Sequence, residues 1–123
     1  MGSADGAIGV IGGGQLARML SEAAALRGID VLVQTASEAD CAVAASSRLV
    51  QALPTDQEAT RELARDCSGI TFENEWVSVD ALMPLERQGV SFVPSLASLV
   101  PLVNKLSQRR RLADLTIPSP PWT

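Results

Sequence analysis

The chain has 123 residues, of which 46% are hydrophobic and 3% aromatic, and it carries a net charge of −4 at pH 7. This length suits one domain with an aliphatic core, and the acidic balance argues against a nucleic-acid partner. The sequence contains no histidine, and its two cysteines, Cys41 and Cys67, lack metal-ligand spacing. A structural zinc site and a histidine-based catalytic triad are therefore excluded. Scattered thiols, no signal peptide and no membrane-length apolar run predict a cytoplasmic protein without membrane contact.

The first predicted element is a strand at residues 7–11, followed by three consecutive glycines and by a helix at residues 15–27. Gly12, Gly14 and Ala17 fit the G-x-G-x-x-G/A fingerprint, in which backbone N–H groups and a helix N-terminus approach a phosphate. Glycine reaches positive φ at low cost and keeps a Cβ out of the ligand's way. The alternative is a strand–helix turn that uses glycine for packing alone.

Four more strands are predicted after this turn, and they alternate with helical segments without internal repeats. The pattern is typical of an α/β fold with a Rossmann-like, doubly wound parallel sheet of five strands. In the common strand order 3-2-1-4-5, the first strand is central. The four further strands are placed at residues 30–34, 48–52, 70–72 and 90–93.

Caps and breakers predict the later helices. Thr55 and Glu58 form a capping box that opens a helix with Cys67 on its apolar face. Pro84 lies within the next helix, at residues 78–88, and should kink it or delay its start. Two further helices are predicted, a short one capped by Ser95 and a last one at residues 102–115.

Two loops are expected to meet at the carboxyl edge of the sheet. Residues 12–15 leave the first strand and residues 73–76 leave the fourth, and these strands flank the switch point where such sheets bind ligands. Glu73 and Glu75 alternate along the second loop, so one is expected to face the crevice, although either could be a solvated loop acid. Trp76, in the same loop, is expected in the core.

A nicotinamide dinucleotide is one candidate ligand for such a crevice. It requires an acid at the end of the second strand to bind the ribose hydroxyls. That strand ends in Gln34-Thr35, whereas Glu38 and Asp40 follow several residues later. The dinucleotide-binding module of an oxidoreductase is therefore the weaker interpretation. A non-catalytic ligand-binding or assembly domain with the same fold stays open.

Four segments resemble the N-terminal portion of the 5-(carboxyamino)imidazole ribonucleotide synthases, a family of the ATP-grasp superfamily in purine biosynthesis. They read IGVIGGGQLARML, ITFENEWV, PSLASLVPLVNKLSQRRRL and IPSPPW, and they follow the family's order from about residue 7 to residue 122. The resemblance implies a ligase that uses ATP, Mg²⁺ and bicarbonate to carboxylate 5-aminoimidazole ribonucleotide.

The resemblance also implies roles for individual residues. The family's first loop, part of its ribotide site, corresponds to Gly12, Gly13, Gly14, Gln15 and Leu16. Its T-[YF]-E-x-E segment corresponds to the loop with Glu73 and Glu75, and its ATP-contacting basic residue to Lys105. Asn74, Trp76 and Asn104 depart from the residues that are usual in the family, and Lys105 is more often Arg.

The resemblance further predicts a domain organisation. Residues 1–6 are expected to be a disordered leader, residues 7–116 a pre-ATP-grasp substrate-binding domain, and residues 117–123 the linker to a missing ATP-grasp domain. Family members continue for two domains that hold the ATP grasp and the magnesium carboxylates. The 123-residue chain alone is therefore expected to be inactive, with no catalytic residue, bound cofactor or metal. A homodimer is compatible with this reading, and the apolar residues Leu99, Leu102, Val103 and Leu106 are expected to pack on the missing domains or, if exposed, to drive self-association.

Overall fold

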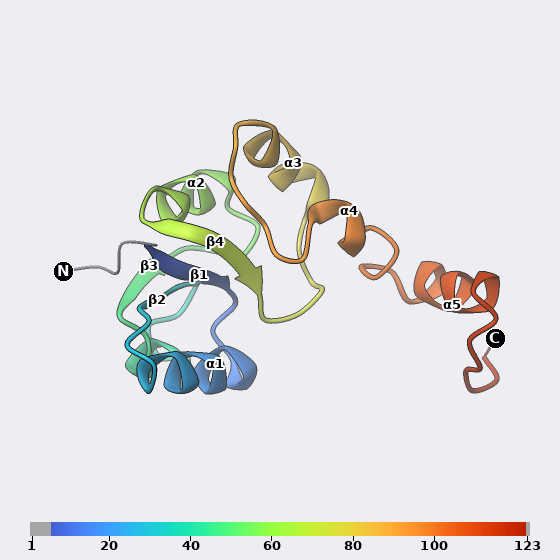
Figure 1. Cartoon of the computed structure of the whole chain (residues 1–123), viewed down its shortest axis with the longest axis horizontal. Coiled ribbons are helices and arrows are strands. Elements are labelled where there is room, and N and C mark those ends of the chain that lie inside the picture. The colour runs from blue at the N-terminus through green and yellow to red at the C-terminus, as the bar shows by residue number, and fades with distance from the viewer. Residues whose placement is uncertain (1–5, 123) are drawn as a thin grey trace.

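The structure is a computed structural model that describes residues 6–122 (Figure 1). The leader expected at residues 1–6 lies outside this described part, apart from Gly6. Strands and helices alternate along the chain, as predicted. Their bounds are β1 Ala7–Ile11, α1 Gln15–Ala25, β2 Val31–Thr35, the 3-10 helix η1 Val43–Ala45, β3 Arg48–Gln51, α2 Gln57–Arg65, β4 Cys67–Phe72, α3 Val79–Arg87, α4 Leu96–Leu99 and α5 Lys105–Asp114.

The strands form one parallel sheet in the order β3-β2-β1-β4. Strand β1 lies inside the sheet, where it pairs with β2 on one side and with β4 on the other. This confirms the α/β class and the predicted order of the first four strands. The carboxyl ends of β1 and β4 are in register, because Ile11 pairs with Phe72 at the last position of both strands.

The sheet has four strands rather than the predicted five. In the described part of the chain, residues 90–93 contribute a single bridge, between Ile70 of β4 and Phe92. Two hydrogen bonds of 2.9 Å join the backbone of Ile70 to the residues on either side of Phe92. The ladder cannot continue through Pro94, which has no N–H to donate. Phe92 is nevertheless a core residue, with 6% of its surface exposed.

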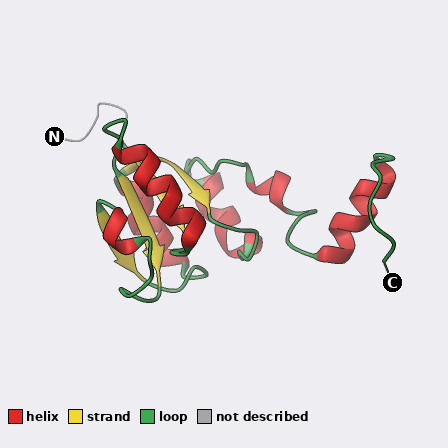
Figure 2. Cartoon of the chain, turned by 90° about the horizontal axis from the view of Figure 1, so that it is seen from below, coloured by secondary structure: helices red, strands yellow, loops and turns green. Residues whose placement is uncertain are grey.

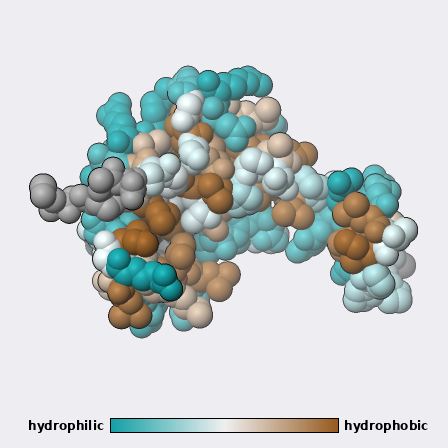
Figure 3. Space-filling model, viewed as in Figure 1, coloured by the Kyte–Doolittle hydropathy of each residue, from teal (hydrophilic) through white to brown (hydrophobic). Residues whose placement is uncertain are grey.

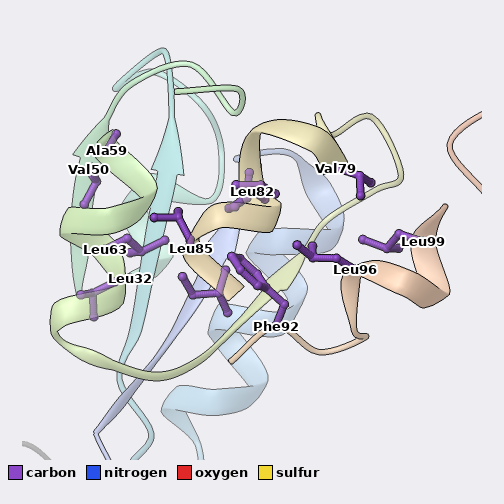
Figure 4. Packing of buried hydrophobic residues seen from close by; sticks show 12 residues of the cluster. Leu32, Val50, Ala59, Leu63, Val79, Leu82, Leu85, Phe92, Leu96 and Leu99 are labelled. Carbon is purple, nitrogen blue, oxygen red and sulfur yellow. The ribbon is translucent and has the colours of Figure 1, made fainter. Parts of the chain in front are cut away.

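Helices cover both faces of the sheet (Figures 1 and 2). Successive side chains of β1 point to opposite faces. Val10 packs with Ala17 and Ala24 of α1 on one face. Ile11 belongs to a larger cluster on the other face, which Figure 4 shows from close by. Helices α2 and α3 contribute to that cluster the fully buried side chains of Leu63, Leu82 and Leu85.

Two predicted boundaries around α2 are wrong. The carboxylate of Asp56 accepts a hydrogen bond of 3.0 Å from the backbone N–H of Ala59, so Asp56 rather than Thr55 caps this helix. Aspartate is the stronger N-cap, which explains the shift of one position. Cys67 is the first residue of β4 and does not lie on the helix. Strand β4 is therefore longer than the predicted strand at residues 70–72.

Pro84 lies inside α3 without delaying its start at Val79. A proline within a helix costs one backbone hydrogen bond. The neighbouring positions Leu82 and Leu85 are fully buried, and their burial offsets that loss. Among residues 6–122, no helix is both long and apolar enough to cross a membrane.

The C-terminal part of the chain leaves the sheet after α4, and α5 stands away from it (Figures 1, 2 and 3). Every residue of α5 is at least partly exposed. The helix begins at Lys105, three residues later than the predicted start of the helix at 102–115. Leu99 belongs to the domain's own core, with 5% exposure, whereas Leu102 and Leu106 are exposed at 36% and 43%.

Candidate functional site

The turn after β1 and the loop after β4 lie against each other, as the strand order predicts. The backbone N–H of Glu73 donates to the carbonyl of Ile11 at 3.0 Å, which extends the pairing of β4 with β1 by one residue. The carboxylate of Glu73 then turns toward the glycines and accepts a hydrogen bond of 2.9 Å from the backbone N–H of Gly14. Two stretches that are remote in the sequence therefore build one edge of the sheet.

The glycines make room for the side chains that pack on them. Gly12 has a φ of +116°, and a Cβ at this position would lie 2.6 Å from Oε2 of Glu73. A Cβ at Gly14 would collide with Oε1 of the same carboxylate, and a Cβ at Gly13 would lie 2.7 Å from Oγ1 of Thr35. Positive φ is thus required at Gly12, whereas Gly14 has an ordinary φ of −84°. The packing role considered for these glycines is therefore present.

Glu73 gives α1 an acceptor that its own N-terminus lacks. Gly14 is the N-cap, and Ala17 at N3 has no side-chain acceptor that could reach back to the N–H of Gly14 as in a capping box, so this N–H donates to Glu73 from another loop. A carboxylate is favoured here because the N-terminus of a helix carries partial positive charge. It occupies the place where a ligand phosphate was predicted to meet Gly14. Gln15 and Leu16, the next two predicted site residues, are exposed on the first turn of the helix.

Glu75 pairs with Lys105 of α5, and the distance from Oε1 to Nζ is 3.3 Å. The backbone N–H of its own residue, and then the Lys105 ammonium, hold the pKa of Glu75 below its ordinary value. The structure therefore joins an acid predicted to bind substrate to a lysine predicted to touch ATP. The two acids of this loop therefore have different partners: Glu73 contacts the glycine turn, and Glu75 contacts the first residue of α5.

The prediction that Trp76 lies in the core is wrong, because 71% of its surface is exposed. Its backbone N–H donates to the side chain of Asn74 at 2.9 Å. The next N–H, of Val77, donates to the carbonyl of Glu75 at 2.9 Å. This tight turn directs the indole outward, while Val77 and the buried Val79 pack against the core.

Sequence reasoning missed a second contact to the glycine turn, from the end of β2. The hydroxyl of Thr35 donates to the carboxylate of Asp40, which folds back from the following loop. Gln34 is fully buried, and its side chain bonds to the hydroxyl of Thr60 and the carbonyl of Leu53. The sequence does contain an acid, Asp40, five residues after the end of the strand. The composition of the loop did not indicate that this side chain folds back to Thr35.

A group of three or more potential metal ligands does not occur within residues 6–122. The side chains at the edge of the sheet can instead accept hydrogen bonds, through the carboxylates of Glu73 and Glu75. They can also contribute positive charge through Lys105. This chemistry fits a ligand with hydroxyl or amino groups that approaches from the carboxyl edge.

Comparison with protein families matches residues 6–101 to the ribonucleotide synthetase preATP-grasp domain. The match covers both loops of the site, and it ends before Lys105.

Two relatives show the same likeness in their sequences. N5-carboxyaminoimidazole ribonucleotide synthase from Synechocystis is 47% identical over 113 residues, which cover 92% of this chain and 29% of that protein. The enzyme of the same name from Synechococcus elongatus is 48% identical, with the same coverage of both chains. The chain thus spans less than a third of the length of these relatives.

Solved structures of enzymes with this name have the same fold. The synthetase from Thermotoga maritima superposes with a TM-score of 0.83 at 28% identity, covering 94% of this chain and 32% of that one. The Aspergillus clavatus synthase in complex with ADP and 5-aminoimidazole ribonucleotide has a TM-score of 0.79 at 34% identity, covering 92% and 30%. These matches confirm the resemblance that the four sequence segments indicated.

Proposed function

Because this chain belongs to the ribonucleotide synthetase preATP-grasp domain family, we propose that it forms part of the substrate site of a purine-biosynthesis ligase. The ligase would carboxylate 5-aminoimidazole ribonucleotide with bicarbonate, at the expense of ATP. The observation that carries this proposal is the contact between Glu73 and the glycine turn, at the edge where such sheets bind ligands. A relative with 34% identity was solved with this ribotide and ADP.

In this proposal the residues 12–16 and the acids Glu73 and Glu75 surround the ribotide. One oxygen of Glu73 stays on the N–H of Gly14, and the other accepts a hydrogen bond from a hydroxyl or amino group of the ligand. The Glu73 carboxylate already accepts the N–H of Gly14 at 2.9 Å. A phosphate placed there would have to displace this carboxylate, because two anions on one donor repel each other. The phosphate is therefore assigned to donors beyond Gly14, such as the exposed start of α1 at Gln15 and Leu16.

Lys105 is proposed to lie on the ATP side of the site. Its ion pair with Glu75 places it beside the ribotide acids, so one residue of α5 would link the two ligands. The ATP grasp, with its Mg²⁺ ligands, would come from further domains like those of the longer relatives. The 123-residue chain by itself is then expected to bind ribotide weakly and to have no turnover. A cytoplasmic location and a homodimer stay predictions of the same proposal.

The test is a ribotide titration of the 123-residue chain, followed by NMR. Chemical shifts should change at residues 12–16 and 73–76, and the signals of the exposed face of α2 around Glu62 should stay unchanged. Glu73→Gln or Glu75→Gln should weaken binding by about 1–3 kcal/mol if that carboxylate bonds the ligand. Glu62→Gln, which removes an exposed carboxylate from α2, is the matched control and should leave the affinity unchanged.

Several outcomes would contradict the proposal. A folded spectrum without shift changes at millimolar ribotide would do so, as would shift changes confined to other surfaces. Phosphate release above a no-enzyme control, measured with ATP, bicarbonate and the ribotide, would contradict the expected lack of turnover by the chain alone.

A further inference from the structure

The glycine turn is held from the side opposite Glu73 by the loop that follows β2. The backbone N–H of Ala42 donates to the carbonyl of Gly13 at 3.1 Å, and the thiol of Cys41 points to the same oxygen at 3.8 Å. Ala42 is fully buried in the cluster that includes Ala17 of α1. The position of the Gly13 peptide therefore depends on where this loop lies.

Thr35 sets how close that loop and the glycine turn approach each other. It is the last residue of β2, and only 4% of its surface is exposed. A Cβ added to Gly13 would lie 2.7–2.8 Å from three atoms of the Thr35 side chain, so this side chain packs directly on the glycine. The preceding carbonyl, of Gln34, accepts a hydrogen bond of 2.9 Å from the N–H of Gly12. The end of β2 thus holds two of the three glycines.

Asp40 fixes the orientation of Thr35. Its carboxylate accepts the hydrogen bond from the Thr35 hydroxyl, which selects one rotamer of a β-branched side chain and ties the loop to the strand end. The backbone of Asp40 is itself held, because its N–H donates to Ser37 at 3.2 Å and its carbonyl accepts from Val43 at 3.0 Å. The acid is therefore part of a closed local structure.

We propose that Asp40 is a positioning residue of the ribotide site and acts through Thr35 on the glycine turn. Two acids then hold the turn from opposite sides: Glu73 bonds directly to Gly14, and Asp40 locks the side chain that packs on Gly13. Without Asp40 the glycine turn would move relative to Glu73. The ligand could then no longer contact the glycine turn and the Glu73 carboxylate at the same time. The effect on ribotide binding rests on the proposed function, whereas the effect on the turn does not.

Amide hydrogen exchange tests the effect on the turn without any ligand. In Asp40→Ala, the amides of Gly14 and Ala42 should exchange at least about tenfold faster, because both report bonds of the clamped turn. Amides in the centre of the sheet, such as Val10 and Val33, should keep their rates. Glu38→Ala removes an exposed acid from the same loop and is the matched control, with unchanged exchange at all four positions.

Conservative variants separate positioning from a general loss of stability. Asp40→Asn keeps an acceptor for the Thr35 hydroxyl and should restore slow exchange at Gly14 and Ala42. Thr35→Val removes the hydroxyl without changing the shape of the side chain and should show the same faster exchange at Gly14 and Ala42. This variant keeps the proposal testable if Asp40→Ala does not fold. Equal acceleration throughout the sheet, or unchanged exchange at Gly14 and Ala42 in Thr35→Val, would overturn the proposal.

Ribotide titration of the same variants tests the link to binding. The dissociation constant should rise several-fold in Thr35→Val and return toward the wild-type value in Asp40→Asn. If the wild-type chain binds no ribotide, the proposed function fails. The exchange experiment still decides whether Asp40 and Thr35 hold the glycine turn in place. If wild type binds and Thr35→Val binds equally well despite a loosened turn, the positioning role is overturned.

Discussion

The carboxylate of Glu73 accepts a hydrogen bond from the backbone N–H of Gly14, although 59 positions separate the two residues. This contact connects the end of β4 to the start of α1. It explains why side chains are excluded at Gly12 and Gly14, since the carboxylate fills the space that a Cβ would need. The glycine turn is therefore an internally packed structure as well as a candidate ligand site.

Substitution of the turn glycines should destabilise the fold. Gly12→Ala combines a positive φ with a contact of 2.6 Å to Glu73 and should lower the free energy of unfolding by about 1–3 kcal/mol. Gly14→Val adds bulk at the same carboxylate and should also abolish ribotide binding. The control is Gly69→Ala in β4, where a Cβ would meet its nearest neighbour at 3.8 Å. Urea denaturation measures the difference, and equal stability of Gly12→Ala and Gly69→Ala would contradict it.

Asp56 should stabilise α2 more than its neighbour Thr55 does. Asp56→Ala leaves the N–H of Ala59 without its side-chain acceptor and should cost about 1 kcal/mol. Thr55→Ala removes the residue that the sequence pattern favoured as the cap and should change stability little. Thermal unfolding of both variants tests this, and a larger loss in Thr55→Ala would restore the capping box.

The two cysteines should differ in their reactivity and in their effect on stability at high pH. Burial, and then the nearby Asp66 carboxylate, raise the pKa of the Cys67 thiol from 9.0 to about 11. In the unfolded chain the thiol loses its proton at lower pH than in the folded chain. The free energy of unfolding should therefore be unaffected by this group below pH 9 and should fall as the pH rises from about 9 to about 11.

Urea denaturation across that range measures the effect. In Cys67→Ala the fall should be shallower than in wild type. Cys41 is the more exposed of the two thiols. A thiol reagent at neutral pH should modify Cys41 before Cys67. Faster modification of Cys67 in the folded chain would contradict this assignment.

Removal of the Lys105 ammonium should raise the pKa of the Glu75 carboxyl. The rise should be incomplete, because the backbone N–H of Glu75 is the larger cause of the lowered pKa and stays in place in Lys105→Met. A pH titration of the Glu75 side chain by NMR measures the shift, and Arg110→Met on the same helix is the control. An unchanged titration curve in Lys105→Met would show that the ion pair is not formed in solution.

We expect no useful affinity for NADH. The side chain of Gln34, at the end of β2, bonds to Thr60 and to the Leu53 carbonyl, and the carboxylate of Asp40 accepts the Thr35 hydroxyl. Strand β2 therefore ends in Gln34-Thr35 and has no acid at the position where the ribose hydroxyls of a dinucleotide bind. A fluorescence titration should show no saturation, and micromolar binding would contradict this expectation.

The order of the elements follows from the sequence because its signals are local. Apolar periodicity and the glycines place β1, the turn and α1 within a few residues, and the alternation of strands and helices indicates a parallel sheet. The meeting of the glycine turn with the loop after β4 could also be predicted, because parallel strands 1 and 4 end at one edge. The family resemblance depends on the same local segments.

What the sequence determined by itself was thus the α/β class, the order of the first four strands and the edge that carries the candidate site. The tertiary structure decided which side chains occupy that edge. In the folded chain the Glu73 carboxylate binds the N–H of Gly14, and the Asp40 carboxylate binds the hydroxyl of Thr35. The side chain of Trp76 is exposed, and the expected fifth strand is reduced to one bridge. Each of these depends on contacts between residues that different elements bring together, and neither periodicity nor propensity along a single segment contains the direction in which a loop side chain points.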